Sequence, residues 1–394
     1  MTRIRLPFLL LLILVLFPPP AVEGQSLLST QGLGFPVEPL DGRSMALGAV
    51  GLGLSGSSLL PTDPAASSRL LIPTVYVTLQ PSWGEGSLEG EALTTRGTRF
   101  PLLGLAYPVR AWRGMVTLTF GSFMDQRWEI RQEKTIDLGG TDTPVTDRFT
   151  SDGGVSAVRL GWAQQLGEGL SAGVNVGSYT GSVRRTFVRS FDSLSATGEV
   201  QPFRDGGKWR LTGFTASAGV NWTPTRLLHL AGSVTWSGDL DADPSDDTEG
   251  AEATFRLPLE LRLGASSLLT PRLAVNAGVT RADWSDAGEG ALDPDAVRET
   301  AWTVGGGLEW KGPTLGTRDI PLRIGYRRAD LPFHFRGAAA TETAFAGGLG
   351  VNLTQAEDLV LAGLDLALER GEREAGALSE TFWRGTLTVK VAGW

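Results

Sequence analysis

The stretch TFRLPLELRLG, residues 254–264, decides how the rest of the sequence is interpreted. Apolar side chains occupy every second position: Phe255, Leu257, Leu259, Leu261 and Leu263. Charged side chains lie between them: Arg256, Glu260 and Arg262. Successive side chains of an extended chain point to opposite faces, so the pattern predicts a β-strand with one hydrocarbon face and one charged face. The fold then depends on which medium each face meets.

Segments with this alternation recur from residue 73 to the end of the chain. Fourteen are predicted, near residues 73–83, 97–108, 114–131, 153–166, 170–188, 208–222, 227–237, 253–268, 272–284, 300–310, 320–330, 342–354, 359–370 and 380–392. Mostly short connections alternate with longer, more polar ones such as 132–152 and 189–207. Short turns at one end and long loops at the other are typical of an outer-membrane barrel. We therefore predict an all-β fold, a 14-stranded antiparallel transmembrane β-barrel over residues 73–394.

A soluble β-sandwich is the alternative, because its strands alternate in the same way. The tryptophans favour the barrel, since two belts of indole at opposite strand ends are expected where rings bridge hydrocarbon and headgroups. Near the short turns lie Trp112, Trp162, Trp222, Trp310 and Trp394, and near the long loops lie Trp128, Trp209, Trp236, Trp284, Trp302 and Trp383. From these we predict a membrane-interface girdle of Trp128, Trp162, Trp222, Trp236, Trp302, Trp310, Trp383 and Trp394.

The barrel assigns a medium to each face of the strands. Lipid is expected against Leu257, Leu259 and Leu261, and the lumen against the charged face. The predicted lumen-facing charges are Arg159, Arg256, Glu260, Arg262, Glu309, Arg323, Arg327, Asp365 and Arg384. Pairing among themselves, or with chain inside the lumen, is the plainest role for them. A kink releases backbone pairing, and Gly121-Ser122 is one candidate for a gap in the wall, although a glycine required for packing is the favoured explanation.

Composition and the N-terminus limit the possible functions. Met1–Gly24 has two arginines, a short apolar run and small residues at its end, which predicts a secretory signal peptide. The chain has no cysteine and only two histidines, so we expect no disulfide, no metal site and no cofactor. The net charge of -8 argues against a nucleic-acid partner. We expect an exported protein that reaches a Gram-negative outer membrane after signal-peptide removal.

Three motifs are set aside. GLGLSG, residues 51–56, matches a dinucleotide-binding pattern, but prolines follow it where a helix is needed. DLDADP, residues 239–244, lacks the glycine and the glutamate of a calcium loop and is interpreted as an acidic outer loop. His229 is expected to point inward near a short turn and His334 to lie in a long loop, so they do not share a metal.

Residues 25–72 precede the first predicted strand and contain Gly42-Arg43-Ser44, the glycine-rich stretch 48–53 and Asp63-Pro64-Ala65. In this order the pieces resemble the start of the FadL family of outer-membrane transporters for hydrophobic compounds and its PorV-like relatives. The family's short Asn-Pro-Ala motif has Asp63 in place of Asn here. The resemblance implies that residues 25–72 form an N-terminal hatch inside the lumen, with Arg43, Asp63, Pro64 and Ala65 as hatch residues. It also implies that a solute leaves sideways through a gap in the wall.

The resulting functional hypothesis is a channel without catalytic activity. We expect passive uptake of hydrophobic or amphipathic, fatty-acid-like small molecules. A plugged structural barrel that docks partner proteins, as in secretion or attachment, is the alternative. The expected partners are outer-membrane lipid, lipopolysaccharide, a hydrophobic ligand and the barrel-assembly machinery. That machinery favours a C-terminal aromatic in phase with the apolar face, whereas Trp394 is out of phase with Val391 unless a bulge lies near Gly393.

Overall fold

The computed structural model describes residues 26–88, 91–191, 201–290, 297–315, 318–356 and 359–393. The predicted signal peptide and Trp394 lie outside the described residues. The elements are η1 (Leu27–Thr30), β1 (Phe35–Pro36), α2 (Gly42–Ala46), η2 (Ala66–Arg69), β2 (Thr74–Leu88), β3 (Glu91–Val109), η3 (Arg110–Trp112), β4 (Gly114–Asp125), β5 (Trp128–Asp137), β6 (Asp142–Gly167), β7 (Leu170–Phe191), β8 (Phe203–Trp222), β9 (Leu228–Pro244), β10 (Ala253–Phe255), β11 (Leu259–Thr270), β12 (Leu273–Asp283), η4 (Ser285–Gly290), β13 (Thr300–Trp310), β14 (Thr314–Leu315), β15 (Arg318–Asp319), β16 (Leu322–Phe335), β17 (Ala338–Ala356), β18 (Leu359–Ala375) and β19 (Leu378–Ala392). In the part of the chain that is described, no helix is long and apolar enough to cross a membrane.

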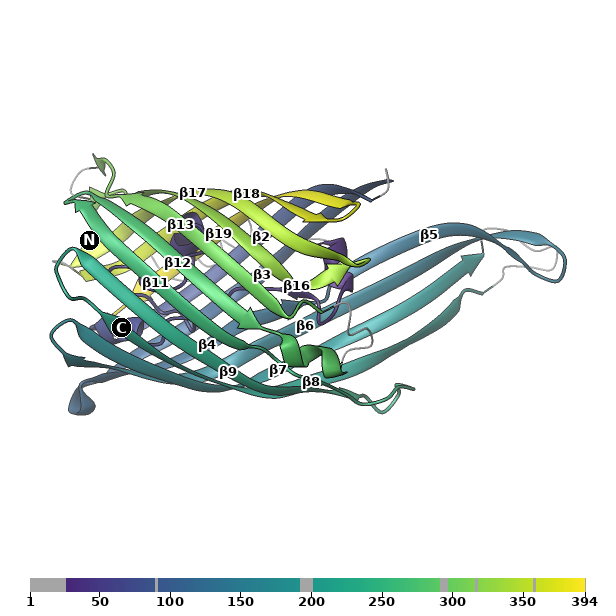
Figure 1. Cartoon of the computed structure of the whole chain (residues 1–394), viewed down its shortest axis with the longest axis horizontal. Coiled ribbons are helices and arrows are strands. Elements are labelled where there is room, and N and C mark those ends of the chain that lie inside the picture. Colours follow the sequence, from purple (N-terminus) through teal and green to yellow (C-terminus); the bar gives the residue numbers. More distant parts are fainter. Residues whose placement is uncertain are drawn as a thin grey trace.

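Fourteen long strands of the described residues form one closed antiparallel sheet (Figure 1). They are β2, β3, β4, β6, β7, β8, β9, β11, β12, β13, β16, β17, β18 and β19. The sheet closes where β19 pairs with β2, from Leu378 opposite Leu88 to Ala392 opposite Thr74. Closure leaves no free edge, so the backbone hydrogen bonds are made within the protein, as lipid requires. The predicted 14-stranded barrel is confirmed.

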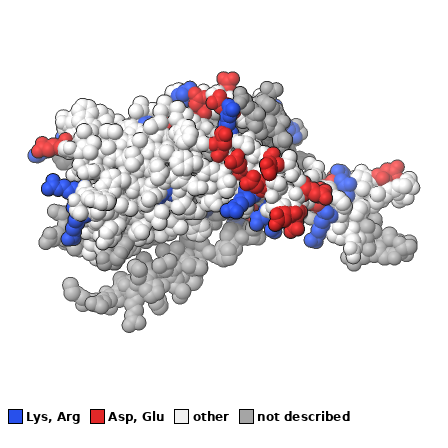
Figure 2. Space-filling view, turned by 90° about the horizontal axis from the view of Figure 1, so that it is seen from below, with Lys and Arg blue, Asp and Glu red and all other residues white. Residues whose placement is uncertain are grey.

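The outer face of the barrel is apolar and the inner face is polar. Leu259, Leu261 and Leu263 expose 42%, 44% and 63% of their surface, whereas Arg262 between them exposes 7%. In β16, likewise, Ile324 is exposed and Arg323 is buried. Figure 2 shows the resulting broad zone without charge between charged groups at the two ends of the molecule. A sandwich would bury its leucines, so the exposed leucines decide for a barrel with its apolar face outward.

For part of residues 254–264, the predicted inward or outward direction of the side chains is wrong. Proline has no N–H for the sheet ladder, and here β10 ends at Phe255 and β11 begins at Leu259, so Pro258 lies in the break between them. Across the break the alternation changes face. Phe255 and Leu257 therefore pack against an inner cluster, and Arg256 is exposed. The predictions that Leu257 meets lipid and that Arg256 lines the lumen are wrong.

The strands also extend further than predicted at the long-loop end. The blue and teal ends of β5, β6, β7 and β8 project well beyond the remaining strands (Figure 1). The predicted loop 132–152 is largely strand, and in the described part of the predicted loop 189–207 residues 189–191 and 203–207 are strand. Residues 239–244, predicted to be an acidic loop, are the end of β9. The predicted strand 114–131 is two strands, β4 and β5. Beyond the membrane both faces of a strand meet water, so the strand has no alternation of apolar and polar residues by which it can be predicted.

Residues 26–72, called the N-terminal segment below, lie against the inner side of the wall. Helix α2 contacts β16, β17, β18 and β19. Inward glycines make this close approach possible: a Cβ on Gly325 would lie 2.2 Å from the backbone nitrogen of Gly48, and one on Gly305 would lie 2.0 Å from its oxygen. GLGLSG also packs here, because a Cβ on Gly53 would lie 2.6 Å from Gly264. The role of this segment as a hatch stays a prediction.

We expect Gly325→Val to displace the N-terminal segment while the barrel stays closed. Overpacking costs about 1–3 kcal/mol, which raises the open population by roughly 5- to 150-fold. Limited proteolysis followed by mass spectrometry would show faster cleavage within residues 26–72. Gly347→Val is the matched control, because a Cβ there meets nothing closer than 4.0 Å. Equal cleavage rates in the two variants would contradict the close approach at Gly325.

Candidate ligand passage in the lumen

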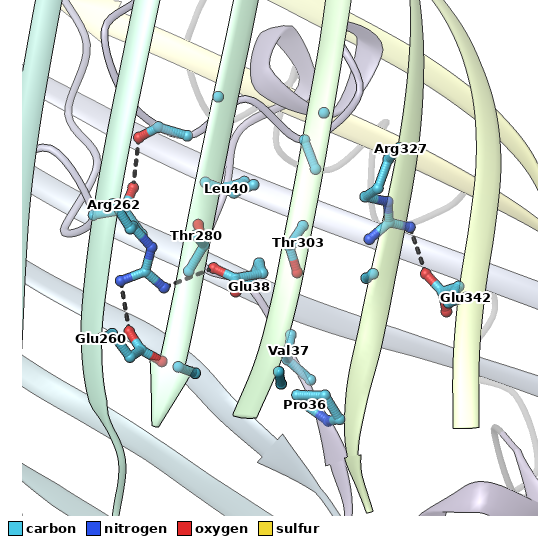
Figure 3. Close-up of a pocket in the computed structure, with 18 of the residues that line it drawn as sticks. Pro36, Val37, Glu38, Leu40, Glu260, Arg262, Thr280, Thr303, Arg327 and Glu342 are labelled. Atoms are coloured by element: carbon cyan, nitrogen blue, oxygen red, sulfur yellow. Dashed lines mark hydrogen bonds and ion pairs between the residues drawn. The ribbon is translucent and has the colours of Figure 1, made fainter. Parts of the chain in front are cut away.

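A central cavity lies between the N-terminal segment and strands β11, β12, β13 and β16 (Figure 3). Its volume is about 110 Å³, enough for several water-sized groups. The apolar part of its lining includes Phe35, Val37, Leu40, Trp284 and Leu331, and the charged part includes Glu38, Glu260, Arg262, Arg327 and Glu342. Mainly apolar walls with a few placed polar groups are typical of small-molecule sites. Trp284, predicted near the membrane interface, is buried and faces this cavity.

A side cavity of about 50 Å³ adjoins the central cavity and is lined by Phe123, Met124, Arg159 and Tyr179 among others. Arg159 exposes 8% of its surface, and its Cζ atom lies 5.9 Å from the centroid of the Tyr179 ring. The Tyr179 hydroxyl is hydrogen-bonded to Ser237 at 2.9 Å. Among the described residues no carboxylate lies within 4.0 Å of the Arg159 guanidinium. The same lining holds Glu38, Glu260 and Arg262, so its formal charges balance, and Arg159 is the arginine there that has no carboxylate of the described residues in direct contact.

A wall gap opens between β3 and β4. Their backbone pairing stops at Leu102 opposite Gly121, and the end of β4 pairs with β1 inside the lumen instead. The space left is about 280 Å³. The candidate Gly121-Ser122 lies at this point, and Gly121 also packs closely on the N-terminal segment, because a Cβ there would lie 2.9 Å from Pro39 Cβ. Side chains bridge the gap: Ser122 Oγ donates to the Phe100 oxygen at 3.1 Å, and Arg127 Nη2 donates to the Thr98 oxygen at 3.1 Å.

An ion-paired triad lies on the inner side of the wall gap. Asp125 accepts from Arg99 Nε at 2.9 Å and from Arg127 Nη2 at 2.7 Å. Val37 lines the wall gap as well as the central and side cavities, and Pro36 and Glu38 line both cavities. The three spaces therefore adjoin one another around residues 36–38 of the N-terminal segment. Together they form a candidate passage from the lumen to the barrel wall.

Two ion clusters fix the N-terminal segment and the inner wall. In the first, Arg43 binds Glu309 through two contacts of 2.8 Å, and its Nη1 donates to the Ser55 oxygen at 2.7 Å. Arg323 binds the same Glu309 at 2.6 Å and Asp365 at 2.5 Å. All four charged residues were predicted from the sequence, and the structure brings them together as one cluster.

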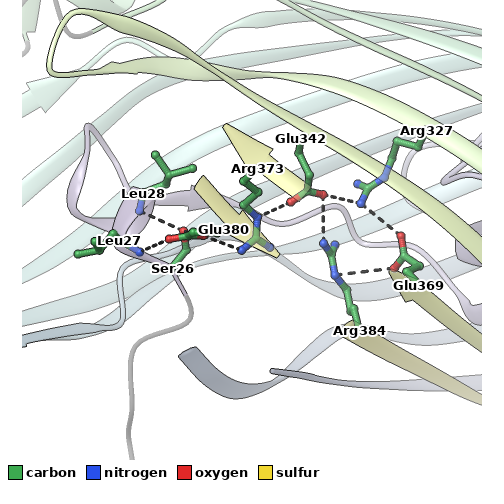
Figure 4. Close-up of polar contacts among 9 residues, drawn as sticks. All are labelled: Ser26, Leu27, Leu28, Arg327, Glu342, Glu369, Arg373, Glu380 and Arg384. Atoms are coloured by element: carbon green, nitrogen blue, oxygen red, sulfur yellow. Dashed lines mark hydrogen bonds and ion pairs between the residues drawn. The ribbon is translucent and has the colours of Figure 1, made fainter. Parts of the chain in front are cut away.

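The second cluster, called the Glu342 cluster, lies on β16, β17, β18 and β19 (Figure 4). Its members are Arg327, Glu342, Glu369, Arg373, Glu380 and Arg384. Glu342 binds Arg327, Arg373 and Arg384 at 2.5, 2.6 and 3.1 Å. Glu380 accepts from Ser26 Oγ at 2.6 Å and from the Leu27 N–H at 2.9 Å, which fixes the start of the N-terminal segment. Three arginines and three glutamates balance in charge.

The sequence predicted only part of the Glu342 cluster. Arg327 and Arg384 were expected in the lumen, whereas Glu342, Glu369, Arg373 and Glu380 were not identified. Strand alternation could have identified two of them, because Glu369 and Arg373 lie an even number of residues after inward-facing Asp365 on the same strand. Arg373 was missed because β18 continues beyond the predicted end at residue 370, whereas Glu380 begins a predicted strand. Among the remaining predicted charges, Arg262 binds Glu260 at 2.5 Å and Glu38 at 3.2 Å.

The other predicted hatch residues form a turn against β7, β8 and β9. Asp63 is buried and accepts hydrogen bonds from the Gly53 N–H, the Ala66 N–H and Asn221 Nδ2 at 3.2, 3.2 and 3.1 Å. Burial raises the pKa of the Asp63 carboxyl, against the lowering effect of these hydrogen bonds. Pro64 and Ala65 pack closely on the wall, where a Cβ on Gly173 would lie 2.4 Å from the Pro64 oxygen. The departure from Asn is thus accommodated by three donors.

The predicted girdle residues lie on the outer face or near it. Exposed indoles are Trp222, Trp236, Trp302, Trp310 and Trp383, and half-buried ones are Trp128 and Trp162. Trp162 contacts Trp112 with ring centroids 5.7 Å apart. Their function as interface anchors stays a prediction, and Trp394 lies outside the described residues. No group of three or more potential metal ligands occurs in the described part of the chain.

The fold and its cavities define a transmembrane β-barrel that encloses an N-terminal segment, and this fits an outer-membrane protein. No family model matches the chain, and no curated protein matches it. The chain shares its fold with solved structures of FadL-type transporters, of which three are described here. A FadL homologue of Pseudomonas aeruginosa is 13% identical, with TM-score 0.61, covering 91% of this chain and 99% of that one. The toluene transporter TbuX of Ralstonia pickettii is 15% identical (0.59; 91% and 99%), and the toluene transporter TodX of Pseudomonas putida is 16% identical (0.55; 91% and 98%).

We expect Glu342→Gln to destabilise the barrel strongly. The substitution removes one charge from a site where three buried guanidiniums converge, and breaking a buried ion pair costs about 3–5 kcal/mol. Urea unfolding in detergent, followed by the heat-modifiable gel mobility typical of barrels, measures the loss. Glu372→Gln is the control, because Glu372 lies exposed on the neighbouring strand. A loss no larger than that of the control would show that the cluster contributes little to stability.

Proposed function

We propose that this protein is a passive outer-membrane channel for hydrophobic and amphipathic small molecules. The observation that carries the proposal is that the central cavity, the side cavity and the wall gap adjoin one another around residues 36–38. Two proteins of the same fold are named toluene transporters. A solute would enter the lumen from the long-loop end, bind in the amphipathic cavity and leave through the wall into the membrane. The structures of this fold compared above are named as two toluene transporters and a FadL homologue.

The N-terminal segment serves as the hatch in this proposal. A fourteen-strand barrel is wider than its own side chains fill, so an empty lumen would pass water and ions. The segment is held at its start by Glu380, near its middle by Glu309 and at Asp63 by Asn221. These contacts support a plug that stays in place while residues 36–38 adjust to a ligand. The mature chain, freed of its signal peptide, would be inserted by the barrel-assembly machinery among outer-membrane lipid and lipopolysaccharide.

Arg159 supports an amphipathic acid as the preferred substrate. Its guanidinium is buried and lacks a carboxylate partner among the described residues, whereas Arg262 and Arg327 nearby are paired. Arginine binds carboxylates through paired hydrogen bonds. A fatty-acid-like solute would place its carboxylate at Arg159 and its hydrocarbon chain along the apolar lining near Trp284. An uncharged hydrocarbon would use the apolar lining alone.

A docking barrel is the second candidate function. The projecting ends of β5 to β8 support it, because they extend the protein well beyond the rest of the barrel and offer a large surface (Figure 1). Uptake by vesicles separates the two candidates. Liposomes with the purified protein should take up labelled laurate and toluene faster than empty ones, whereas a docking barrel should add nothing.

We expect Arg159→Met to slow laurate uptake at limiting concentration while leaving toluene uptake unchanged. A hydrogen-bonded charge contributes about 1.5–3 kcal/mol, which corresponds to roughly a 10- to 100-fold weaker affinity for laurate. The matched control is Arg328→Met, because Arg328 lies on the exposed face of β16. If both solutes slow equally in Arg159→Met, Arg159 has a structural role and does not select carboxylates.

Closing the wall gap should block uptake without altering ligand binding. The chain has no cysteine, so Phe100→Cys and Ser122→Cys together introduce the only thiols. These residues touch across the gap, where Ser122 donates to the Phe100 oxygen. A short thiol-reactive cross-linker should stop uptake, and a reducible form of it should allow recovery on reduction. Uptake that continues through the cross-linked barrel would rule out the wall gap as the exit.

A further inference from the structure

A fourth cavity lies at the short-turn end of the lumen and shares no lining residue with the passage described above. Its volume is about 180 Å³. The N-terminal segment, the β8–β9 turn and the adjoining ends of β9, β11 and β12 surround it. We call it the short-turn cavity and define it by Arg69, Thr223, Arg226, Leu228, His229 and Ser266.

The short-turn cavity is basic. Two arginines line it, and none of the described residues in its lining is acidic. Arg69 donates to the Gly56 oxygen at 2.9 Å, and no carboxylate of the described chain lies within 4.0 Å of its guanidinium. Burial lowers the pKa of Arg69, against the opposing effect of Asp63. Arg226 is exposed at the rim and adds positive potential there.

The histidine beside Arg69 does not balance this charge. Arg69 Nη2 lies 2.8 Å from His229 Nε2, and Thr223 Oγ1 lies 2.8 Å from His229 Nδ1. Arg69 Nη2 also lies 3.2 Å from His229 Nδ1, and because arginine only donates, the ring nitrogen that accepts from it carries no proton and the ring is neutral. His229 thus orients Arg69 without neutralising it. The guanidinium keeps hydrogen-bonding capacity for an anion in the cavity.

We propose that the short-turn cavity is a second binding site for the carboxylate of an amphipathic acid, with Arg69 as its charged partner. Leu227, Leu228 and Leu268 line the same space and provide contacts for hydrocarbon, which favours an amphiphile over free phosphate. The inference rests on the proposed function, since it assigns a second site to the same class of substrate. It places that site at the end of the lumen opposite the long loops, separate from Arg159.

The two histidines of the chain make the proposal measurable. Histidine-labelled protein in lipid nanodiscs is titrated with laurate, with dodecanol and with inorganic phosphate. Laurate should shift the ring signals of His229, assigned with His229→Gln, and leave those of His334 unchanged. Dodecanol and phosphate should each bind at least about ten-fold more weakly, because one lacks the charge and the other lacks the hydrocarbon.

Variants separate the two carboxylate sites. Arg69→Met should weaken the laurate-dependent shift of His229 at least about ten-fold, Arg69→Lys should retain part of it, and Arg159→Met should retain all of it. Heat-modifiable gel mobility confirms that each variant is folded. An equal response to dodecanol, or an unchanged titration in Arg69→Met, would overturn the proposal.

The same samples distinguish failure of this inference from failure of the proposed function. Vesicle uptake of laurate without any shift at His229 would remove the second site and leave the channel intact. A shift at His229 without uptake would leave a carboxylate site in a barrel that does not transport.

Discussion

Internal pairing of the backbone is the constraint on which the whole structure depends. In hydrocarbon an N–H or C=O group has no water to bind, so the sheet has to close on itself, as it does where β19 meets β2. The same constraint explains the wall gap. Where β3 and β4 separate, Ser122 and Arg127 donate to the carbonyl oxygens that the ladder leaves free. An opening in the wall is possible because side chains replace the missing backbone bonds.

Closure creates a lumen, and the chain fills it with its own N-terminal segment. Inward glycines let the backbone of this segment lie directly against the wall at Gly48 and Gly53. The charges that alternation places inside are then removed from water, where an unpaired charge is costly. Most buried arginines accordingly bind a carboxylate, as in the two ion clusters. Buried Arg159 and partly exposed Arg69 have no such contact among the described residues, and each lines a cavity of its own. Pairing inside the lumen thus leaves two arginines of the described chain without a direct carboxylate contact, at two separate places.

Individual charged residues were easier to predict from the sequence than their partners. Arg43, Glu309, Arg323 and Asp365 were each identified, but their convergence on one cluster depends on strands far apart in the sequence. Glu342 was overlooked, although it binds three arginines, because it begins a predicted strand and carries no local mark of its partners. Arg256 was assigned to the lumen because the proline two residues later was not recognised as a break in phase.

The sequence by itself determined the closed sheet, its strand number and, apart from the break at Pro258, which face of each strand points outward. Side-chain alternation is a local property, and only the orientation with the apolar face outward is stable in lipid. It also indicated that a separate segment precedes the barrel. Tertiary structure alone decided which charges pair, where the wall opens and which arginines stay without a carboxylate. Those outcomes depend on register between strands and on the path of the N-terminal segment through the lumen, and neither is encoded in the spacing of residues along any one strand.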